Sequence, residues 1–311
     1  MNYVDDFLLH LQIERALTDA TITAYRGDLR HFEDYIDGTA IEDVDRATIR
    51  GFLRELAERG NGTSSRARRL AALKSFFNFL QEEGYREDNP AAAVRLPKPR
   101  PEEPAYLTAE ECQRLLEAVG QATDRTRARD IAIFSLMIGT GIRRSEVIGL
   151  DVQDLDLERG TAQVLRKGRK QQTLPLAEWV VASLQDYLEE RPEVGTGALF
   201  VSERGTRLSQ SALWYRFKHY FSLAGLDEAK ASPKTLRHSF ATMLLRNGVQ
   251  LPVIASLMGH KSVATTQIYT HLGDPELRQA AETISPRIDN ARGGVPTRAK
   301  EIAPAGTREG S

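Results

Sequence analysis

Four residues, drawn from three separate stretches of the chain, have the side chains needed to break a phosphodiester bond. They are Arg143, Arg237, His260 and Tyr269. A phenol can attack phosphorus as a covalent nucleophile, and guanidinium and imidazole groups can hold the oxygens on which negative charge develops. These residue types predict covalent cleavage of DNA, with neither a metal ion nor another cofactor.

Short motifs surround these four residues. They read TGIRRSE over 140–146, LRHSFAT over 236–242, LMGH over 257–260 and TTQIYTH over 265–271. In this order they resemble the tyrosine recombinase or integrase family, most closely its Xer-type site-specific recombinases. The resemblance spans nearly the whole chain up to about residue 283.

The resemblance implies a role for each residue of the site. Tyr269 is expected to be the nucleophile, and Arg143, Arg237 and His260 are expected to bind the phosphate. Glu146 stands one helical turn from Arg143 and is expected to support it by orienting its guanidinium.

Two lysines complete the expected site. Lys167, in a predicted hairpin turn, resembles the family's general acid, which protonates the leaving 5′-oxygen. Lys170 is the alternative, because Arg166 and Gln172 stand where the family more often has glycine and arginine. Lys234 stands where the family usually has histidine; a charged lysine favours electrostatic stabilisation, which leaves the general base to water or to a shared role.

Composition narrows the classes of protein. The chain has 311 residues, enough for two domains, and its formal net charge of -1 gives no global sign of DNA binding. Its single cysteine, Cys112, excludes an internal disulfide and a cysteine metal cluster, and packing is its expected role. The first seventeen residues mix apolar and charged types, so we expect a cytoplasmic protein with no membrane partner.

The fold class expected is mainly α. Residues 1–96 repeat apolar positions every three or four places and predict a helical domain, which the resemblance makes a SAM-like, DNA-binding core-binding domain. Residues 97–105 form a proline-rich linker. Residues 106–284 are expected to form an α+β catalytic domain with a small antiparallel sheet, and residues 285–311 a disordered tail.

Within the catalytic domain, local patterns predict a buried helix and a sheet. The apolar run 131–138 predicts the helix that precedes Arg143. Alternation over 161–165 and 171–176, around a Lys-Gly-Arg-Lys turn, predicts a β-hairpin, and 199–202 is expected to add a third strand.

A one-signed charge run lies near the end of the helical domain. No acidic residue occurs between Gly60 and Gln81, a stretch that carries four basic residues expected to contact DNA: Arg66, Arg68, Arg69 and Lys74. Such residues would displace counterions from phosphates. A solvated helix face is the alternative.

The leading hypothesis is a site-specific DNA recombinase that works through a 3′-phosphotyrosyl intermediate. The resemblance implies a homotetramer on double-stranded DNA, or one shared with a paralogous recombinase, with residues 277–284 docking on a neighbour. Chromosome dimer resolution and movement of a phage or mobile element are alternative roles. A DNA-binding accessory protein and a topoisomerase-like enzyme are alternative functions.

Overall fold

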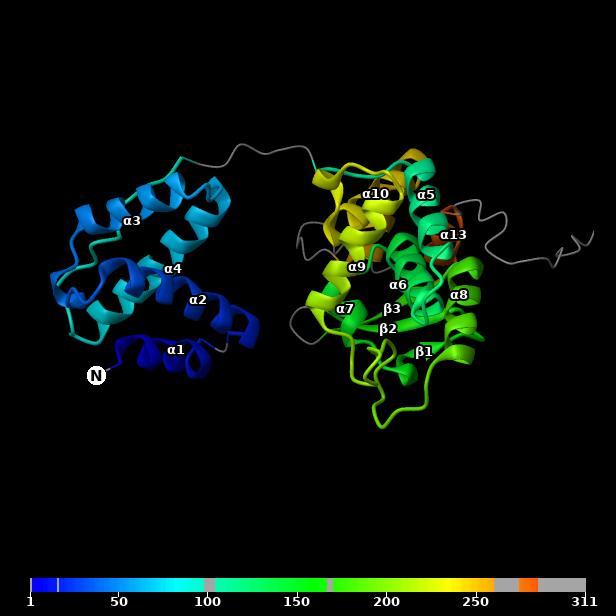
Figure 1. Ribbon diagram of the computed structural model, residues 1–311, viewed down its shortest axis with the longest axis horizontal. Helices are drawn as coiled ribbons and strands as arrows, with labels where there is room; N and C mark the ends of the chain where they lie inside the picture. The colour runs from blue at the N-terminus through cyan, green and yellow to red at the C-terminus, as the bar shows by residue number, and fades with distance from the viewer. Residues whose placement is uncertain (1, 16, 98–103, 167–169, 260–273, 285–311) are drawn as a thin grey trace, which may run out of the picture. The chain divides into compact units, whose positions relative to one another are not determined.

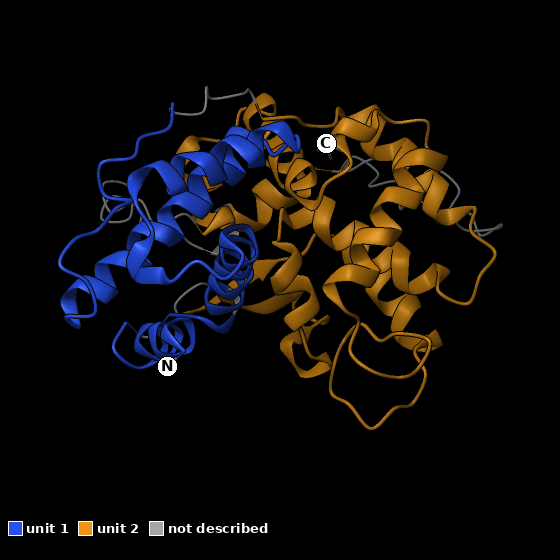
Figure 2. Ribbon diagram, turned by 60° about the vertical axis from the view of Figure 1, so that its left-hand side comes forward, with its two compact units in different colours: residues 1–102 blue, residues 103–311 orange. Residues whose placement is uncertain are grey.

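The computed structural model describes residues 2–15, 17–97, 104–166, 170–259 and 274–284. The chain divides into two compact units, residues 1–102 and 103–311 (Figure 2). Three predicted site residues, Lys167, His260 and Tyr269, lie outside the described residues, as does the predicted tail. In the described part, no helix is both long enough and apolar enough to cross a membrane.

The first unit is built from helices around a core rich in phenylalanine. Phe7, Phe32, Phe76 and Phe77, on the positions predicted from the helical period, are at most 1% exposed. Burial of these faces stabilises helices that would be marginal alone. The elements are α1 (Tyr3–Ile13), α2 (Asp19–Ile36), the 3-10 turn η1 (Ile41–Asp43), α3 (Arg46–Glu58) and α4 (Thr63–Glu82).

The second unit is centred on α6 (Arg127–Thr140), whose residues 132–140 are all buried. Helices α5, α8 and α10 pack against it, as Figure 1 allows the reader to follow. A capping box of Thr108 and Glu111 begins α5, and Cys112 is fully buried in that helix, in keeping with its expected packing role. The helices are α5 (Ala109–Gly120), α7 (Arg144–Gly149), α8 (Glu178–Glu190), α9 (Gln210–Leu223), α10 (Pro233–Arg246), α11 (Leu251–Met258) and α13 (Asp274–Glu282), with 3-10 turns η2 (Val152–Asp154) and η3 (Glu228–Lys230).

The predicted hairpin is confirmed. Strands β2 (Thr161–Arg166) and β3 (Lys170–Pro175) pair antiparallel, with Arg166 opposite Lys170 at the turn end. A two-residue strand, β1 (Leu155–Asp156), pairs with β2 and completes a three-stranded antiparallel sheet in the order β1-β2-β3. The fold is therefore mainly helical with a small antiparallel sheet, as the sequence predicts.

The prediction of a third strand at residues 199–202 is wrong. Val201 makes only an isolated bridge with Arg207, outside the sheet. The Leu199 carbonyl oxygen accepts hydrogen bonds from the side chains of Tyr187 and Arg191 instead. Side chains thus occupy an acceptor that a neighbouring strand would otherwise use. The strand that does form, β1, was not predicted because two residues are too few to show alternation.

Candidate active site

The turn between α6 and α7 places Arg143. Gly141 ends α6 in the left-handed conformation, with φ of 60°, and a Cβ there would lie 2.6 Å from Phe240 of α10. Glycine is thus required both by the backbone and by the close approach of α10. The chain then enters α7 with Arg143 at its N-terminal cap.

Glu146 binds two arginines. Its Oε1 accepts from Arg143 Nη1 at 2.7 Å, and its Oε2 accepts from Arg166 Nη1 at 2.5 Å. Oε2 also accepts from the backbone N–H of Arg143 at 2.9 Å, which caps α7. The Glu146 side chain is 5% exposed and that of Arg143 is 39% exposed. One buried carboxylate therefore orients a guanidinium that remains open to solvent.

Arg237, on α10, is buried without a carboxylate partner among the described residues. Its Nη1 donates to the Gly141 carbonyl at 2.7 Å, and its Nη2 donates to the Met258 carbonyl at 2.5 Å. Burial, followed by repulsion from Arg143 and Arg166, lowers the pKa of Arg237 to about 10. The side chain stays charged at neutral pH, in surroundings that do not balance that charge.

Arg166 is the site residue that the sequence did not assign. It is 7% exposed and lies on the inward face of β2 with Ala162 and Val164. The sequence did contain a signal for this role. Arg166 is a charged residue at a position where the alternation of β2 predicts burial, and a buried guanidinium needs partners. Burial lowers the pKa of Arg166, and Glu146 opposes that effect.

Lys234 lies in the first turn of α10 and is exposed. Its side chain has no hydrogen-bond or ion-pair partner within the described ranges. Burial lowers the pKa of His238, one turn further on, and Lys234 and Arg237 add repulsion. Lys234 thus adds positive charge beside the cluster rather than inside it.

We call Arg143, Glu146, Arg166 and Arg237 the arginine cluster. Its three guanidiniums face one carboxylate, so the described part of the site has an excess of two positive charges. Guanidiniums bind oxyanions through paired hydrogen bonds, and a phosphate would supply the missing negative charge. No group of residues able to hold a metal ion occurs in the described ranges.

The basic residues of α4 are partly neutralised. Arg68 forms an ion pair with Asp28, whose carboxylate is 4% exposed, and Arg69 lies 3.5 Å from the same carboxylate. Arg69 also donates to Asn61, and Arg66 contacts Thr63. The side chain of Arg68 is 49% exposed, and Lys74 is half-buried.

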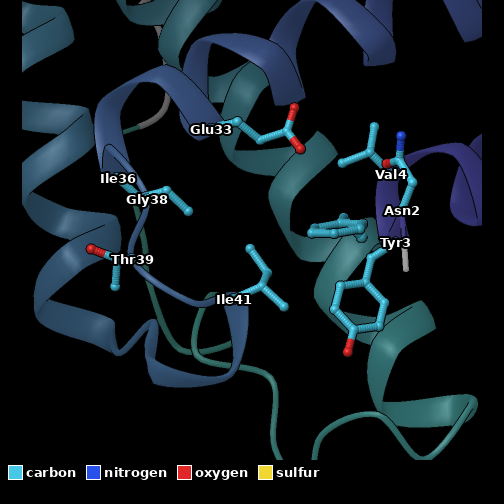
Figure 3. A pocket seen from close by; sticks show the side chains of 9 residues that line it. Asn2, Tyr3, Val4, Glu33, Ile36, Gly38, Thr39 and Ile41 are labelled. Atoms are coloured by element: carbon cyan, nitrogen blue, oxygen red, sulfur yellow. The ribbon is translucent and has the colours of Figure 1, made fainter.

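The first unit also contains a surface hollow, of about 380 Å³, shown in Figure 3. Tyr3 and Val4 of α1, Glu33 of α2 and the turn at Ile41 line it. Burial raises the pKa of Glu33. Among the described residues, none of the proposed cleavage residues lines this hollow.

Comparisons with known proteins identify the family. Residues 105–276 match the phage integrase family, and residues 4–84 match the N-terminal SAM-like domain of phage integrases. Tyrosine recombinase XerD of Haemophilus influenzae is 34% identical over 291 residues, 91% of this chain and 98% of the relative. Tyrosine recombinase XerC of Roseiflexus castenholzii is 36% identical over 300 residues, 93% of this chain and 95% of the relative.

A solved structure agrees with these matches. The XerH site-specific recombinase, in a post-cleavage complex with palindromic difH substrate, is 26% identical. It superposes with a TM-score of 0.65, covering 84% of this chain and 79% of that one. The chain thus belongs to the phage integrase family of tyrosine recombinases.

Proposed function

We propose that this chain is a site-specific recombinase that cuts and rejoins DNA through a 3′-phosphotyrosyl intermediate, with Tyr269 as the nucleophile. The observation that supports this most is the uncompensated charge of the arginine cluster. A purely structural set of buried arginines would carry matching carboxylates, as Arg129 does with Asp130.

The proposed step conserves atoms and bond energy. The Tyr269 oxygen bonds to phosphorus and its proton passes to water, with Lys234 and His260 supplying electrostatic or hydrogen-bond stabilisation. The bond from phosphorus to the deoxyribose 5′-oxygen breaks, and Lys167 gives that oxygen a proton. Attack by a 5′-hydroxyl of another strand reverses the step, so no nucleotide is consumed.

Arg143 and Arg237 are the proposed phosphate ligands in this reaction. Their guanidiniums would bind the non-bridging oxygens as phosphorus gains its fifth bond, when the negative charge is largest. Glu146 would hold Arg143 in place, in keeping with the 2.7 Å contact between them.

The wider assembly is part of the proposal. Double-stranded DNA is the proposed partner, bound by a cytoplasmic, nucleoid-associated homotetramer or by one that includes a paralogous recombinase. Residues 1–96 and 106–284 are the proposed DNA-binding and catalytic domains, joined by the linker 97–105 and followed by the tail 285–311. Resolution of chromosome dimers is the proposed role, with movement of a phage or mobile element as the alternative.

Trapping the covalent complex tests the proposal. The protein is incubated with genomic DNA, the complex is captured under denaturing conditions, and the attached ends are sequenced. A duplex of that sequence, nicked near the cleavage point, then serves as a suicide substrate. Wild-type protein should form an adduct and Tyr269→Phe should bind the duplex without forming one.

The other outcomes separate the alternatives. DNA binding by wild-type protein with no adduct would indicate an accessory protein. Relaxation of supercoiled DNA without strand exchange between two labelled duplexes would indicate a topoisomerase-like enzyme. An adduct formed by Tyr269→Phe would refute the assignment of the nucleophile.

A further inference from the structure

The C-terminal end of α11 is held by three side chains from three other elements. Gln172 of β3 donates to the Ser256 carbonyl at 2.7 Å, and Arg166 of β2 donates to the Leu257 carbonyl at 3.0 Å. Arg237 of α10 reaches the next carbonyl, as described above. Carbonyls in the last turn of a helix lack donors from a following turn, so these side chains cap the end of α11, where Gly259 adopts the left-handed conformation and its N–H also reaches the Ser256 carbonyl.

Arg166 connects this helix end to Glu146. Each of its three side-chain nitrogens has a different partner: Nη1 binds Glu146, Nη2 binds the Leu257 carbonyl, and Nε binds Gln172 Oε1 at 2.9 Å. Because the other oxygen of Glu146 binds Arg143, a continuous chain of hydrogen bonds joins Arg143 to α11.

The space around this junction is closely filled. A Cβ on Gly259 would lie 2.7 Å from Gln172 Oε1 and 3.0 Å from Arg166 Nε. The guanidinium is thus confined on one side by backbone and on the other by Glu146. A side chain held at all three nitrogens loses its rotamer freedom and can transmit a fixed position.

Stability alone explains this arrangement poorly. A buried ion pair adds little net stability, since removing both charges from water offsets their attraction. Arg166 also increases the repulsion felt by Arg237. An arginine that raises the positive charge of the cluster costs stability there, yet it places the carboxylate that orients Arg143.

We propose that Arg166 is a positioning residue for DNA cleavage, which sets the Arg143 guanidinium through Glu146 and ties it to the end of α11. This inference rests on the proposed function, because it assumes that Arg143 binds the scissile phosphate. Arg166 itself need not touch DNA.

The test compares Arg166→Met with Arg129→Met. Both arginines are 7% exposed, and each binds one carboxylate and one backbone carbonyl, which for Arg129 are Asp130 and the Val201 carbonyl. Arg166 differs in binding Gln172 as well. Methionine keeps the apolar stem and removes the charge. Single-turnover cleavage of the nicked substrate is measured at saturating protein, well below the melting temperature, and corrected for the folded fraction.

We expect Arg166→Met to bind DNA normally and to cleave about 10²-fold more slowly, because a misplacement of about 1 Å has such a cost. On a substrate with a scissile methylphosphonate, where methyl replaces a charged oxygen, the deficit should shrink by about tenfold or more, since less charge needs stabilising. Arg129→Met should cleave both substrates at the wild-type rate. Equal deficits on the two substrates, or an equal loss in Arg129→Met, would overturn the proposal.

A double variant tests the path through Glu146. If Arg166 acts through that carboxylate, Glu146→Gln/Arg166→Met should be no slower than Glu146→Gln alone, whereas additive losses would overturn the proposal. If Arg166→Met fails to fold, Arg166→Lys replaces it, because lysine keeps the charge but its single nitrogen cannot reach all three partners. The test is again the rate deficit on the phosphodiester substrate compared with that on the methylphosphonate substrate.

The two proposals can fail separately. An adduct formed by wild-type protein and absent in Tyr269→Phe supports the proposed function whatever Arg166 does. The Arg166 variants are interpreted only relative to that wild-type rate.

Discussion

Replacing Arg237 by methionine should abolish cleavage while changing stability little. The fall of the Arg237 pKa to about 10, from an ordinary arginine value above 12, corresponds to about 3 kcal/mol. The sign follows from linkage: the unfolded chain binds this proton more tightly, so the penalty is complete below pH 10 and disappears as pH rises toward the unfolded value. At neutral pH the charged side chain therefore destabilises the fold by that amount.

Methionine at position 237 removes the cost of the buried charge but also removes two hydrogen bonds. The carbonyls of Gly141 and Met258 lose their donor, at a cost of about 1–3 kcal/mol each. The relief of about 3 kcal/mol offsets much of the total cost of about 2–6 kcal/mol, so Arg237→Met should lower the free energy of unfolding by no more than about 3 kcal/mol. Arg129→Met, which takes one partner from the buried Asp130, should lose about 3–5 kcal/mol.

Urea denaturation at pH 7.5 measures the difference. Wild type, Arg237→Met and Arg129→Met are unfolded in parallel, and cleavage of the nicked substrate is followed for each. If Arg237→Met is destabilised as much as Arg129→Met, the charge of Arg237 is already balanced by the protein and the interpretation of the cluster as a phosphate-binding site is wrong. Added sulfate should stabilise wild type more than Arg237→Met, since it binds the folded state alone.

Three further predictions concern other parts of the chain. Gly259→Ala should unfold at lower urea than Gly248→Ala, because both have positive φ but only residue 259 would press on neighbouring side chains. Cys112 should not react with a thiol reagent at pH 8 until the protein unfolds, since burial raises its pKa to about 12; rapid reaction of native protein would contradict this. Arg68→Ala should reduce the magnitude of the slope of log affinity for DNA against log salt concentration by about one. An unchanged slope would show that Arg68 does not contact DNA.

Much of the fold follows from sequence periodicity. The helical positions of the first unit, the apolar run before Arg143 and the hairpin at 161–176 each carry a local signal, because one face must be buried. The pairing of β1 carries none, since two residues show no alternation. The failed strand at 199–202 illustrates the same limit: its carbonyls are taken by side chains such as Tyr187, which local sequence does not reveal.

The residue types of the site and the local pairing of Glu146 with Arg143 were predictable, whereas the long-range connections were not. The motifs identify Arg143 and Arg237, and the structure brings both into one cluster with Glu146. Arg166 stood out in the sequence only as a departure from the family pattern. Gln172 is six positions away in the same hairpin, but the other two partners lie 20 and 91 positions away, and no spacing rule connects those segments. The pairing of Asp28 with Arg68, 40 positions apart, could not be predicted for the same reason.

The brevity of α11 has a consequence for local opening. A helix of eight residues does not persist in water by itself, so the order of α11 depends on its apolar packing against α10 and α13 and on the side chains from β2, β3 and α10 that bind its end. In hydrogen-exchange experiments the amides of this segment should then exchange together with those of the hairpin, as one cooperative subunit of folding. Arg166→Met should uncouple the two segments. The amides of α11 should then exchange at a lower free energy of opening, while those of the strands keep theirs.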